Sequence, residues 1–165
     1  MCVVLYFLVI DVYNSLFYLC FKIDVEAYSG CGTVDYPIIG DSEREVAGAF
    51  YMLDPDEKDL VGMPVTCRSV FVIGPDLKVK LSITYPPATG RNFHEILRVI
   101  DSLQLSAYQK VATPVNWVAG EDTVILPGIS DEEAKTKFPK GFKTVELPSG
   151  KGYLRMTPDP REATA

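Results

Sequence analysis

Two runs rich in β-branched and aromatic residues, separated by a turn tripeptide, constrain the fold of this chain more than any other feature. Residues 69–73 and 79–85 have the length and composition of strands, and Gly-Pro-Asp at 74–76 between them is typical of a turn. The segment therefore predicts an antiparallel β-hairpin. Two prolines at 86–87 close it, since proline cannot donate to a ladder of backbone hydrogen bonds.

An amphipathic helix is predicted directly after the hairpin. Between residues 92 and 108, apolar residues recur at spacings of three and four, which places them on one face of a helix. These residues are Phe93, Ile96, Leu97, Ile100 and Leu103.

The N-terminal half predicts further helices and strands. The continuous apolar run at 3–10 is typical of a strand buried on both faces of a parallel sheet, and a helical stretch is expected over 13–27. Two glycines flank Cys31, so the segment around it is predicted to be a loop. Asp41 and the acidic residues after it predict the N-cap of a short helix, which is expected to end near a Leu-Asp-Pro turn at 53–55.

The region beyond about residue 108 is predicted to be a small, loop-rich appendage, because its short runs are separated by Pro and Gly. Within it, Ser130 followed by three acidic residues predicts a helix N-terminus. A length of 165 residues suits one main core with such an appendage. Hydrophobic residues at 47% and charged residues at 23% are typical of a chain that folds.

Charge and cysteine content exclude several classes of function. The formal net charge of −6 and the absence of a Lys/Arg stripe argue against binding to nucleic acid. The four cysteines form no CxxC pair and accompany a single histidine, so neither a zinc site nor a thioredoxin-type dithiol is predicted. A reducing, cytoplasmic location is the simpler interpretation. The cysteines are Cys2, Cys20, Cys31 and Cys67.

The first 22 residues are rich in apolar and aromatic side chains and invite comparison with an export signal or a membrane anchor. No Lys or Arg precedes Lys22, whereas a signal peptide begins with a basic region. Asp11, Asn14 and Ser15 interrupt the stretch, whereas a spanning helix needs about 20 apolar residues. A buried strand plus helix is therefore the preferred interpretation, without stable membrane insertion. An alternative or artefactual start and a signal or anchor are the other interpretations.

Few residues point to chemistry when they are taken alone. His94 lies in the first turn of the predicted long helix, where a lone imidazole is usually a surface or capping residue. Cys31 is expected to be exposed and open to oxidation, but no nearby base lowers its thiol pKa. Arg68 lies where the predicted hairpin begins, and a solvated or ion-paired arginine is the ordinary interpretation of such a residue.

Four phrases in order, MLDP, GMPVTCR, TGRNFHEILR and KVATPVNW, resemble the C-terminal part of the 1-Cys peroxiredoxins of mammalian type. The resemblance covers roughly residues 23–160. It implies an α/β fold, namely a partial thioredoxin-like domain of peroxiredoxin type over 1–112. It also implies a small α+β C-terminal extension over 113–165, which takes part in dimer contacts in the family.

The resemblance further implies a thiol-dependent peroxidase that reduces hydrogen peroxide and organic or phospholipid hydroperoxides with a glutathione-type thiol and no cofactor. The family's peroxidatic cysteine lies in a P-x-x-x-T-x-x-C motif, which this sequence does not contain. The chain is therefore expected to begin just after the catalytic helix and to be inactive or impaired by itself. Alternatives are a non-enzymatic dimerisation or regulatory module, as a homodimer or paired with an intact peroxiredoxin, and an incomplete gene product.

Several residues match functional positions of the family. Arg68 matches the active-site arginine, which stabilises the thiolate and the peroxide, and Arg91 matches a second arginine that supports the site. Asp76 matches the aspartate assigned to a secondary phospholipase activity, although it could also simply shape the turn in which it lies. Thr113 matches a position that is phosphorylated in some members.

The same expectation has a consequence for solubility. A chain that lacks part of its core exposes apolar surface on the neighbours of the missing part, such as the strand predicted at 3–10. Poor solubility is therefore predicted.

Overall fold

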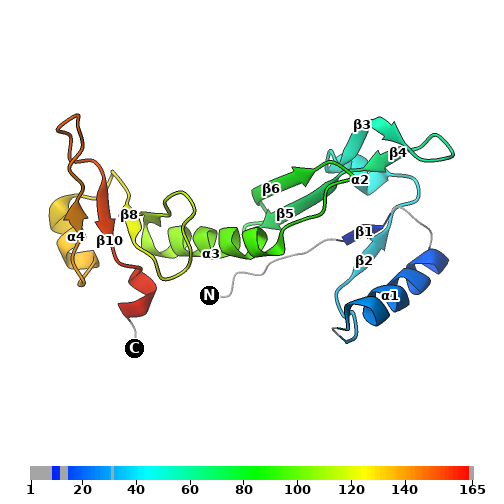
Figure 1. Ribbon diagram of the computed structural model, residues 1–165, viewed down its shortest axis with the longest axis horizontal. Helices are drawn as coiled ribbons and strands as arrows, with labels where there is room; N and C mark the ends of the chain where they lie inside the picture. The colour runs from blue at the N-terminus through cyan, green and yellow to red at the C-terminus, as the bar shows by residue number, and fades with distance from the viewer. Residues whose placement is uncertain (1–8, 12–14, 31, 164–165) are drawn as a thin grey trace. The chain divides into compact units, whose positions relative to one another are not determined.

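The computed structural model describes residues 9–11, 15–30 and 32–163. The chain divides into two compact units, Met1–Arg91 and Asn92–Ala165 (Figure 1). The boundary at 112/113 expected from the family resemblance lies inside the second unit and remains a prediction.

The first unit begins with a parallel strand pair. Strand β1 (Val9–Asp11) pairs with β2 (Ile38–Gly40), and α1 (Ser15–Ser29) connects them. The expected strand at 3–10 is thus confirmed at residues 9 and 10, and residues 3–8 lie outside the described part of the chain. The helix expected over 13–27 is confirmed from Ser15 onward, and residues 13 and 14 also lie outside.

The glycine-rich segment after α1 ends that helix. Gly30 and Gly32 have φ of 65° and 85°, a left-handed conformation that glycine adopts without steric cost. The prediction of a loop is confirmed for these two residues, and Cys31 between them lies outside the described residues.

The short helix α2 (Glu45–Ala49) forms where it was expected, but the details of both its ends differ. The N-cap is Arg44, and the carboxylate of Asp41 accepts the backbone N–H groups of Val46 at 3.1 Å and Ala47 at 2.8 Å. Asp41 therefore satisfies the free donors of the helix N-terminus from three residues before the N-cap.

The Leu-Asp-Pro turn expected at 53–55 was wrong. These residues open β3 (Leu53–Lys58), which pairs antiparallel with β4 (Pro64–Thr66). The strand register shifts between Leu53 and Lys58, and the Asp54 carboxylate accepts the N–H groups of residues 56 and 57 inside the irregular stretch. A proline is tolerated in such a bulge because its missing donor leaves no ladder bond unmade.

The predicted hairpin is confirmed. Strand β5 (Arg68–Ile73) pairs antiparallel with β6 (Val79–Tyr85), with Val70 opposite Ile83. Val70 and Val72 are buried from one face of β5.

The long helix of the second unit is also confirmed. Helix α3 (Phe93–Gln109) begins after Asn92, whose side chain accepts the N–H of Glu95 at 3.3 Å. The expected apolar face is only partly covered. Ile96 and Ile100 are buried, whereas Phe93 and Leu97 are 65% and 58% exposed.

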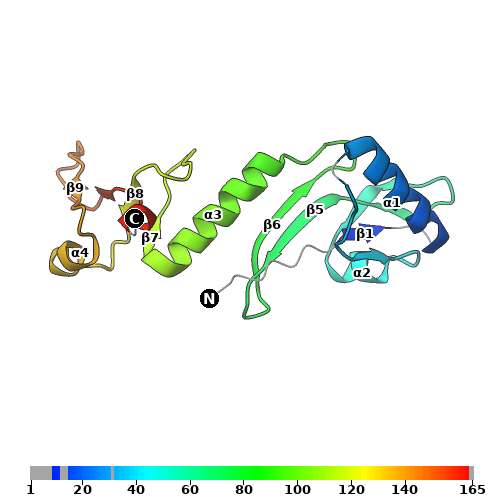
Figure 2. The ribbon, with the colours of Figure 1, turned by 90° about the horizontal axis from the view of Figure 1, so that it is seen from below.

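A four-stranded sheet forms where a loop-rich appendage was expected. Its strand order is β7-β8-β10-β9, and α3 leads directly into β7 (Figure 2). The remaining elements are β7 (Val111–Ala112), β8 (Thr123–Ile125), α4 (Asp131–Lys137), β9 (Lys143–Thr144), β10 (Arg155–Thr157) and the 3₁₀ helix η1 (Pro160–Ala163). Ser130 caps α4 as predicted, because its hydroxyl accepts the N–H of Glu133.

The second unit has a hydrophobic core of its own. Residues from α3, α4, the sheet and the loops contribute to it. Packing in this core therefore stabilises helices and strands that are too short to be stable by themselves. The core residues are Leu105, Val111, Trp117, Ile125, Ile129, Ala134 and Phe138. Among the helices that the structure describes, none is both long enough and apolar enough to cross a membrane.

Candidate functional site

Arg68 is the first residue of β5 and lies opposite Tyr85, the last residue of β6. Its side chain is exposed, and its Nε donates a hydrogen bond to the carbonyl oxygen of Pro87. The prolines that end β6 therefore present a carbonyl to the arginine at the start of β5. This contact fixes the guanidinium of Arg68 at its Nε.

Arg91 lies beside Arg68, although 22 residues of sequence separate them. Its Nη2 donates to the carbonyl oxygen of Ser69 at 3.5 Å. Burial, and after it the positive charge of Arg68, lowers the pKa of Arg91. The structure thus brings together the two arginines that the sequence singled out, at the open end of the hairpin.

Cys67 directly precedes Arg68, and sequence reasoning gave it no role. Its half-buried Sγ lies 3.8 Å from Oδ2 of Asp54. Burial, and then the negative charge of Asp54, raises the pKa of the Cys67 thiol. Because the thiolate is the nucleophilic form, Cys67 is poorly suited to attack a peroxide. No sequence signal places Asp54 beside it, since Asp54 lies in β3 and Cys67 lies between β4 and β5.

Asp76 lies in the turn between β5 and β6. Its carboxylate accepts a hydrogen bond from Nζ of Lys80 at 2.7 Å and from the N–H of Lys78 at 3.3 Å. The contact with Lys80 holds the pKa of Asp76 below its usual value. These contacts suit a residue that shapes the turn, and a phospholipase role for Asp76 remains a prediction.

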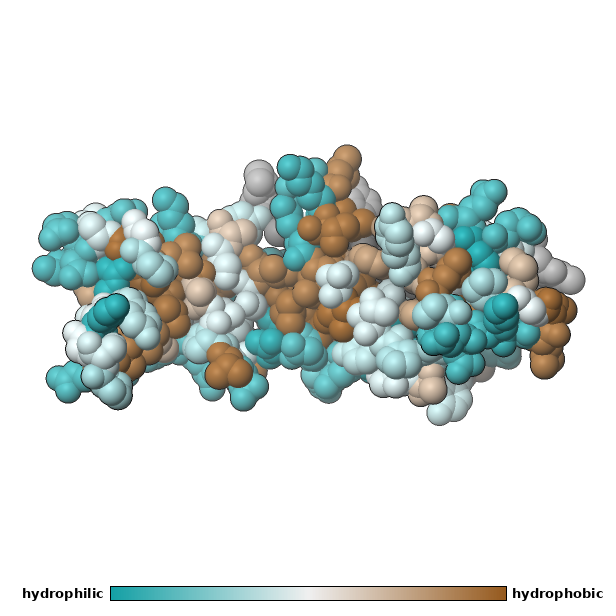
Figure 3. Space-filling model, turned by 90° about the horizontal axis from the view of Figure 1, so that it is seen from above, coloured by the Kyte–Doolittle hydropathy of each residue, from teal (hydrophilic) through white to brown (hydrophobic). Residues whose placement is uncertain are grey.

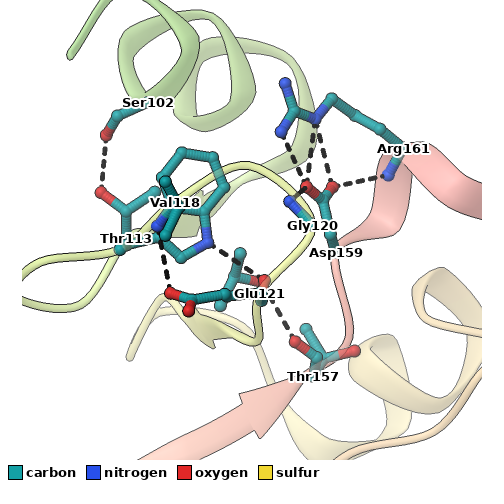
Figure 4. Close-up of polar contacts among 10 residues, drawn as sticks. Ser102, Thr113, Val118, Gly120, Glu121, Thr157, Asp159 and Arg161 are labelled. Carbon is teal, nitrogen blue, oxygen red and sulfur yellow. Dashed lines mark hydrogen bonds and ion pairs between the residues drawn. The ribbon is translucent and has the colours of Figure 1, made fainter. Parts of the chain in front are cut away.

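Thr113 follows β7, and its hydroxyl lies 2.6 Å from that of Ser102 on α3 (Figure 4). The residue is half-buried. Its modification remains a prediction, and a phosphate on this oxygen would have to break the contact with Ser102.

A polar cluster that the sequence did not reveal lies close to Thr113 in the same unit (Figure 4). The carboxylate of Asp159 accepts Nη2 of Arg161 at 2.7 Å and the N–H of Gly120 at 3.1 Å. The Arg161 guanidinium lies 5.5 Å from the ring centroid of Trp117, and the Trp117 Nε1 donates to the carbonyl of Glu121. The cluster fastens the C-terminal end of the described chain to the loop after β7.

The other candidates have no such surroundings. His94 is exposed in the first turn of α3, and no hydrogen bond or ion pair links it to the described residues. Cys31 lies outside them. Within the described ranges, no group of three or more His, Cys, Asp or Glu side chains could hold a metal ion.

Comparison with known proteins identifies the class of fold. The chain is similar to a cysteine-to-serine variant of the peroxiredoxin 6 of Arenicola marina, with a TM-score of 0.89 and 54% identity over 93% of this chain and 70% of that one. It is also similar to a yeast mitochondrial 1-Cys peroxiredoxin, with a TM-score of 0.80 and 38% identity over 92% and 69%. The fold is therefore thioredoxin-like, of peroxiredoxin type, with a C-terminal extension.

Sequence comparison narrows the class. A family model for the C-terminal domain of 1-Cys peroxiredoxin matches residues 102–141. Peroxiredoxin-6 of Gallus gallus is 58% identical over 146 residues, which are 87% of this chain and 65% of that protein. The 1-Cys peroxiredoxin A of Oryza sativa is 54% identical over 134 residues, 81% and 61% of the two chains. The chain belongs to the 1-Cys peroxiredoxins, of the peroxiredoxin-6 type, and it spans about 65% of the length of the curated relatives that it matches most fully.

Proposed function

We propose that this chain supplies the arginine half of a thiol-dependent peroxidase site. The observation that carries the proposal is the juxtaposition of Arg68 and Arg91 at the open end of the hairpin. In peroxidase chemistry of this family, a cysteine thiolate attacks one peroxide oxygen. The S–O bond forms as the O–O bond breaks, and the leaving oxygen takes up a proton.

A guanidinium assists this step in two ways. Its fixed positive charge favours the thiolate over the thiol, and its N–H groups stabilise the negative charge that develops on the leaving oxygen. Arg68 takes this part in the proposal, and Arg91 positions and reinforces it.

A thiol of the glutathione type then reduces the sulfenic acid. The first thiol displaces water and forms a mixed disulfide, and a second thiol releases the cysteine. The similarity to the yeast 1-Cys peroxiredoxin supports this choice of reductant, since the thiol-resolving mechanism of that protein uses glutathione and thioredoxin systems. Hydrogen peroxide and organic hydroperoxides are the proposed substrates, and the cytoplasm is the proposed location.

By itself the chain is proposed to turn over little peroxide. The printed sequence contains no P-x-x-x-T-x-x-C motif, and burial raises the pKa of Cys67, the cysteine nearest the arginine pair in sequence. The test is hydrogen peroxide consumption by the purified chain with glutathione or dithiothreitol. Rates near those of an intact peroxiredoxin would contradict the proposal.

A second candidate function is a non-enzymatic module that associates with a copy of itself or with an intact peroxiredoxin. The separate hydrophobic core of the second unit favours this function, because that unit needs no catalytic residue to stay folded. Apolar residues also remain at the surface (Figure 3), among them Phe93 and Leu97 on α3. Sedimentation of the chain with and without an intact 1-Cys peroxiredoxin tests this. Sedimentation of the chain as a monomer, with both proteins unchanged in the mixture, would contradict it.

A further inference from the structure

The C-terminal end of the described chain is attached to the loop after β7 through one buried carboxylate. Strand β10 ends at Thr157, and Asp159 follows just before η1. The Asp159 carboxylate accepts the N–H of Gly120, in that loop, at 3.1 Å. It also accepts the backbone N–H of Arg161 at 3.0 Å and the Arg161 guanidinium at 2.7 Å (Figure 4). We refer to residues 159–163 as the C-terminal clasp.

A second contact between the clasp and this loop depends on the same carboxylate. The Arg161 guanidinium lies 5.5 Å from the ring centroid of Trp117, so it covers one face of the indole. Asp159 orients that guanidinium, because its two oxygens accept both Nε, at 3.2 Å, and Nη2. Loss of the negative charge on Asp159 therefore weakens both contacts at once.

The loop that the clasp covers also has hydrogen bonds of its own. The Trp117 N–H donates to the carbonyl of Pro114 at 3.2 Å, and the indole Nε1 donates to the carbonyl of Glu121 at 3.0 Å. Trp117 is fully buried, whereas Val115 and Val118 on either side of it are 88% and 52% exposed. Since these neighbours already face solvent, moving the clasp away is expected to expose the covered face of the indole.

The second unit can keep its core when the clasp moves. The buried residues of that core lie between Leu105 and Phe138, well before the clasp. Strand β10 is also fastened immediately before the clasp, because the Thr157 hydroxyl donates to the carbonyl of Gly141 at 2.9 Å. The Thr157 carbonyl in turn accepts the Thr123 hydroxyl at 3.3 Å. Local opening can therefore stop at Thr157, since segments with few core contacts open at a lower free energy than the whole unit.

Acid can remove the charge of the clasp carboxylate while the neighbouring arginines keep theirs, because arginine is not deprotonated in proteins. On α3, Arg98 donates to the carbonyl of Trp117 at 3.2 Å and is paired with Glu95. In the loop after β7, the Glu121 carboxylate accepts a backbone N–H. Glu95 and Glu121 can also take up a proton, but both reach solvent, whereas the side chain of Asp159 is 2% exposed. Protonation of Asp159 therefore removes buried contacts, which protonation of the two glutamates does not.

We propose that the C-terminal clasp is an acid-operated switch: a proton on the Asp159 carboxylate releases residues 159–163 from the loop after β7 and uncovers Trp117, while the core stays folded. The proton occupies an oxygen that accepted hydrogen bonds in the closed state and cancels the negative charge that held Arg161. In the open state, the indole joins Val115 and Val118 in an apolar surface. The switch uses no residue of the proposed peroxidase site and goes beyond that function.

The experiment is acrylamide quenching of the fluorescence of Trp117, the single tryptophan of the full chain, from neutral pH to about pH 3. Far-ultraviolet circular dichroism of the same samples reports whether the helices and strands persist. Although burial opposes it, hydrogen bonds from Arg161 and Gly120 hold the pKa of Asp159 below its usual value, so opening is expected below about pH 4. The quenching constant should rise at least about threefold there, at unchanged circular dichroism.

Two substitutions assign the switch to this carboxylate. Asp159→Asn keeps the shape of the side chain but cannot carry the charge. Its quenching constant should already be raised at least about threefold at neutral pH and should show no further step in acid. Glu121→Gln is the matched control, because it removes an exposed carboxylate from the same loop and keeps an oxygen that can accept the N–H of Val118. This control should stay closed at neutral pH and retain the step in acid.

Three results would overturn the proposal. The first is a parent chain whose quenching shows no acid step, or only a step that coincides with loss of circular dichroism. The second is quenching of Asp159→Asn that equals that of the parent at neutral pH. The third is loss of the acid step in Glu121→Gln. The titration of the parent needs no substitution, so it stays decisive if a variant fails to fold.

Discussion

The buried carboxylate of Asp159 offers a sharp test of how the second unit is held together. Its side chain is 2% exposed, and it receives the Arg161 guanidinium and the N–H groups of Gly120 and Arg161. Asp159→Ala removes the acceptor of all these donors and the carboxylate of the Arg161–Asp159 ion pair. The substitution should therefore weaken the attachment of the C-terminal end to the loop after β7.

The expected loss follows from the burial of the two partners. Breaking a buried ion pair by removing one partner costs about 3–5 kcal/mol. The Arg161 side chain is 35% exposed, so water recovers part of its solvation once Asp159 is gone. We therefore expect a loss of about 2–3 kcal/mol in the free energy of unfolding.

The assay is urea unfolding followed by tryptophan fluorescence. Trp117 is the single tryptophan of the chain, it is fully buried, and Arg161 lies over its ring. The fluorescence therefore reports on the unit that contains Asp159. Asp122→Asn is the matched control, because the Asp122 carboxylate is exposed and lies 3.7 Å from Nζ of Lys143, so no measurable loss is expected. Equal unfolding midpoints for Asp159→Ala and the control would refute the reasoning.

Three further predictions concern acid, capping and thiol reactivity. Burial alone would raise the pKa of Asp159, but the hydrogen bonds from Arg161 and Gly120 outweigh it and hold the pKa below its usual value. The stability that this carboxylate contributes is thus complete above about pH 5 and is lost as the pH falls through the lowered pKa. As the pH is lowered below about 4, the urea midpoint should therefore decrease less in Asp159→Asn than in the parent chain. Asp41→Ala should cost about 1–2 kcal/mol and speed hydrogen exchange of the α2 amides, because two N–H groups lose their acceptor. Cys67 should react with iodoacetamide at pH 7 several-fold more slowly than free cysteine, and Asp54→Asn should speed that reaction.

The sequence predicted those elements whose signals are local. A repeated apolar spacing predicted helix α3, and two β-rich runs around a turn predicted the β5–β6 hairpin. Strand β3 was not predicted because it contains a proline and its register with β4 is irregular. Within the irregular stretch, backbone N–H groups donate to the Asp54 carboxylate instead. A sequence of turn-forming residues does not reveal that a partner strand will pair across the bulge.

The sheet of the second unit was unpredictable for a related reason. Its strands contain two or three residues each, too few to display an alternating pattern. Their pairing joins residues far apart in sequence, as Thr123 with Thr157. Packing around Trp117 holds these short strands, and single-sequence patterns carry no information on such long-range contacts.

In the candidate site, too, the sequence predicted local features and missed contacts between distant residues. Arg68 was expected where a strand begins, and it lies there. Its contact with the Pro87 carbonyl and its proximity to Arg91 depend on how the hairpin closes and on the path of the chain after β6. The placement of Cys67 against Asp54 depends on the pairing of β3 with β4, which the sequence did not predict.

Restoring a peroxidatic cysteine to this chain tests most directly whether its arginines form half of a peroxidase site. The measurement is hydrogen peroxide consumption by the chain joined behind a segment that carries the P-x-x-x-T-x-x-C motif of the family. We expect turnover to appear, to fall at least about 100-fold in Arg68→Gln, and to persist in Lys143→Gln. Turnover that is unaffected by the loss of Arg68 would contradict the account.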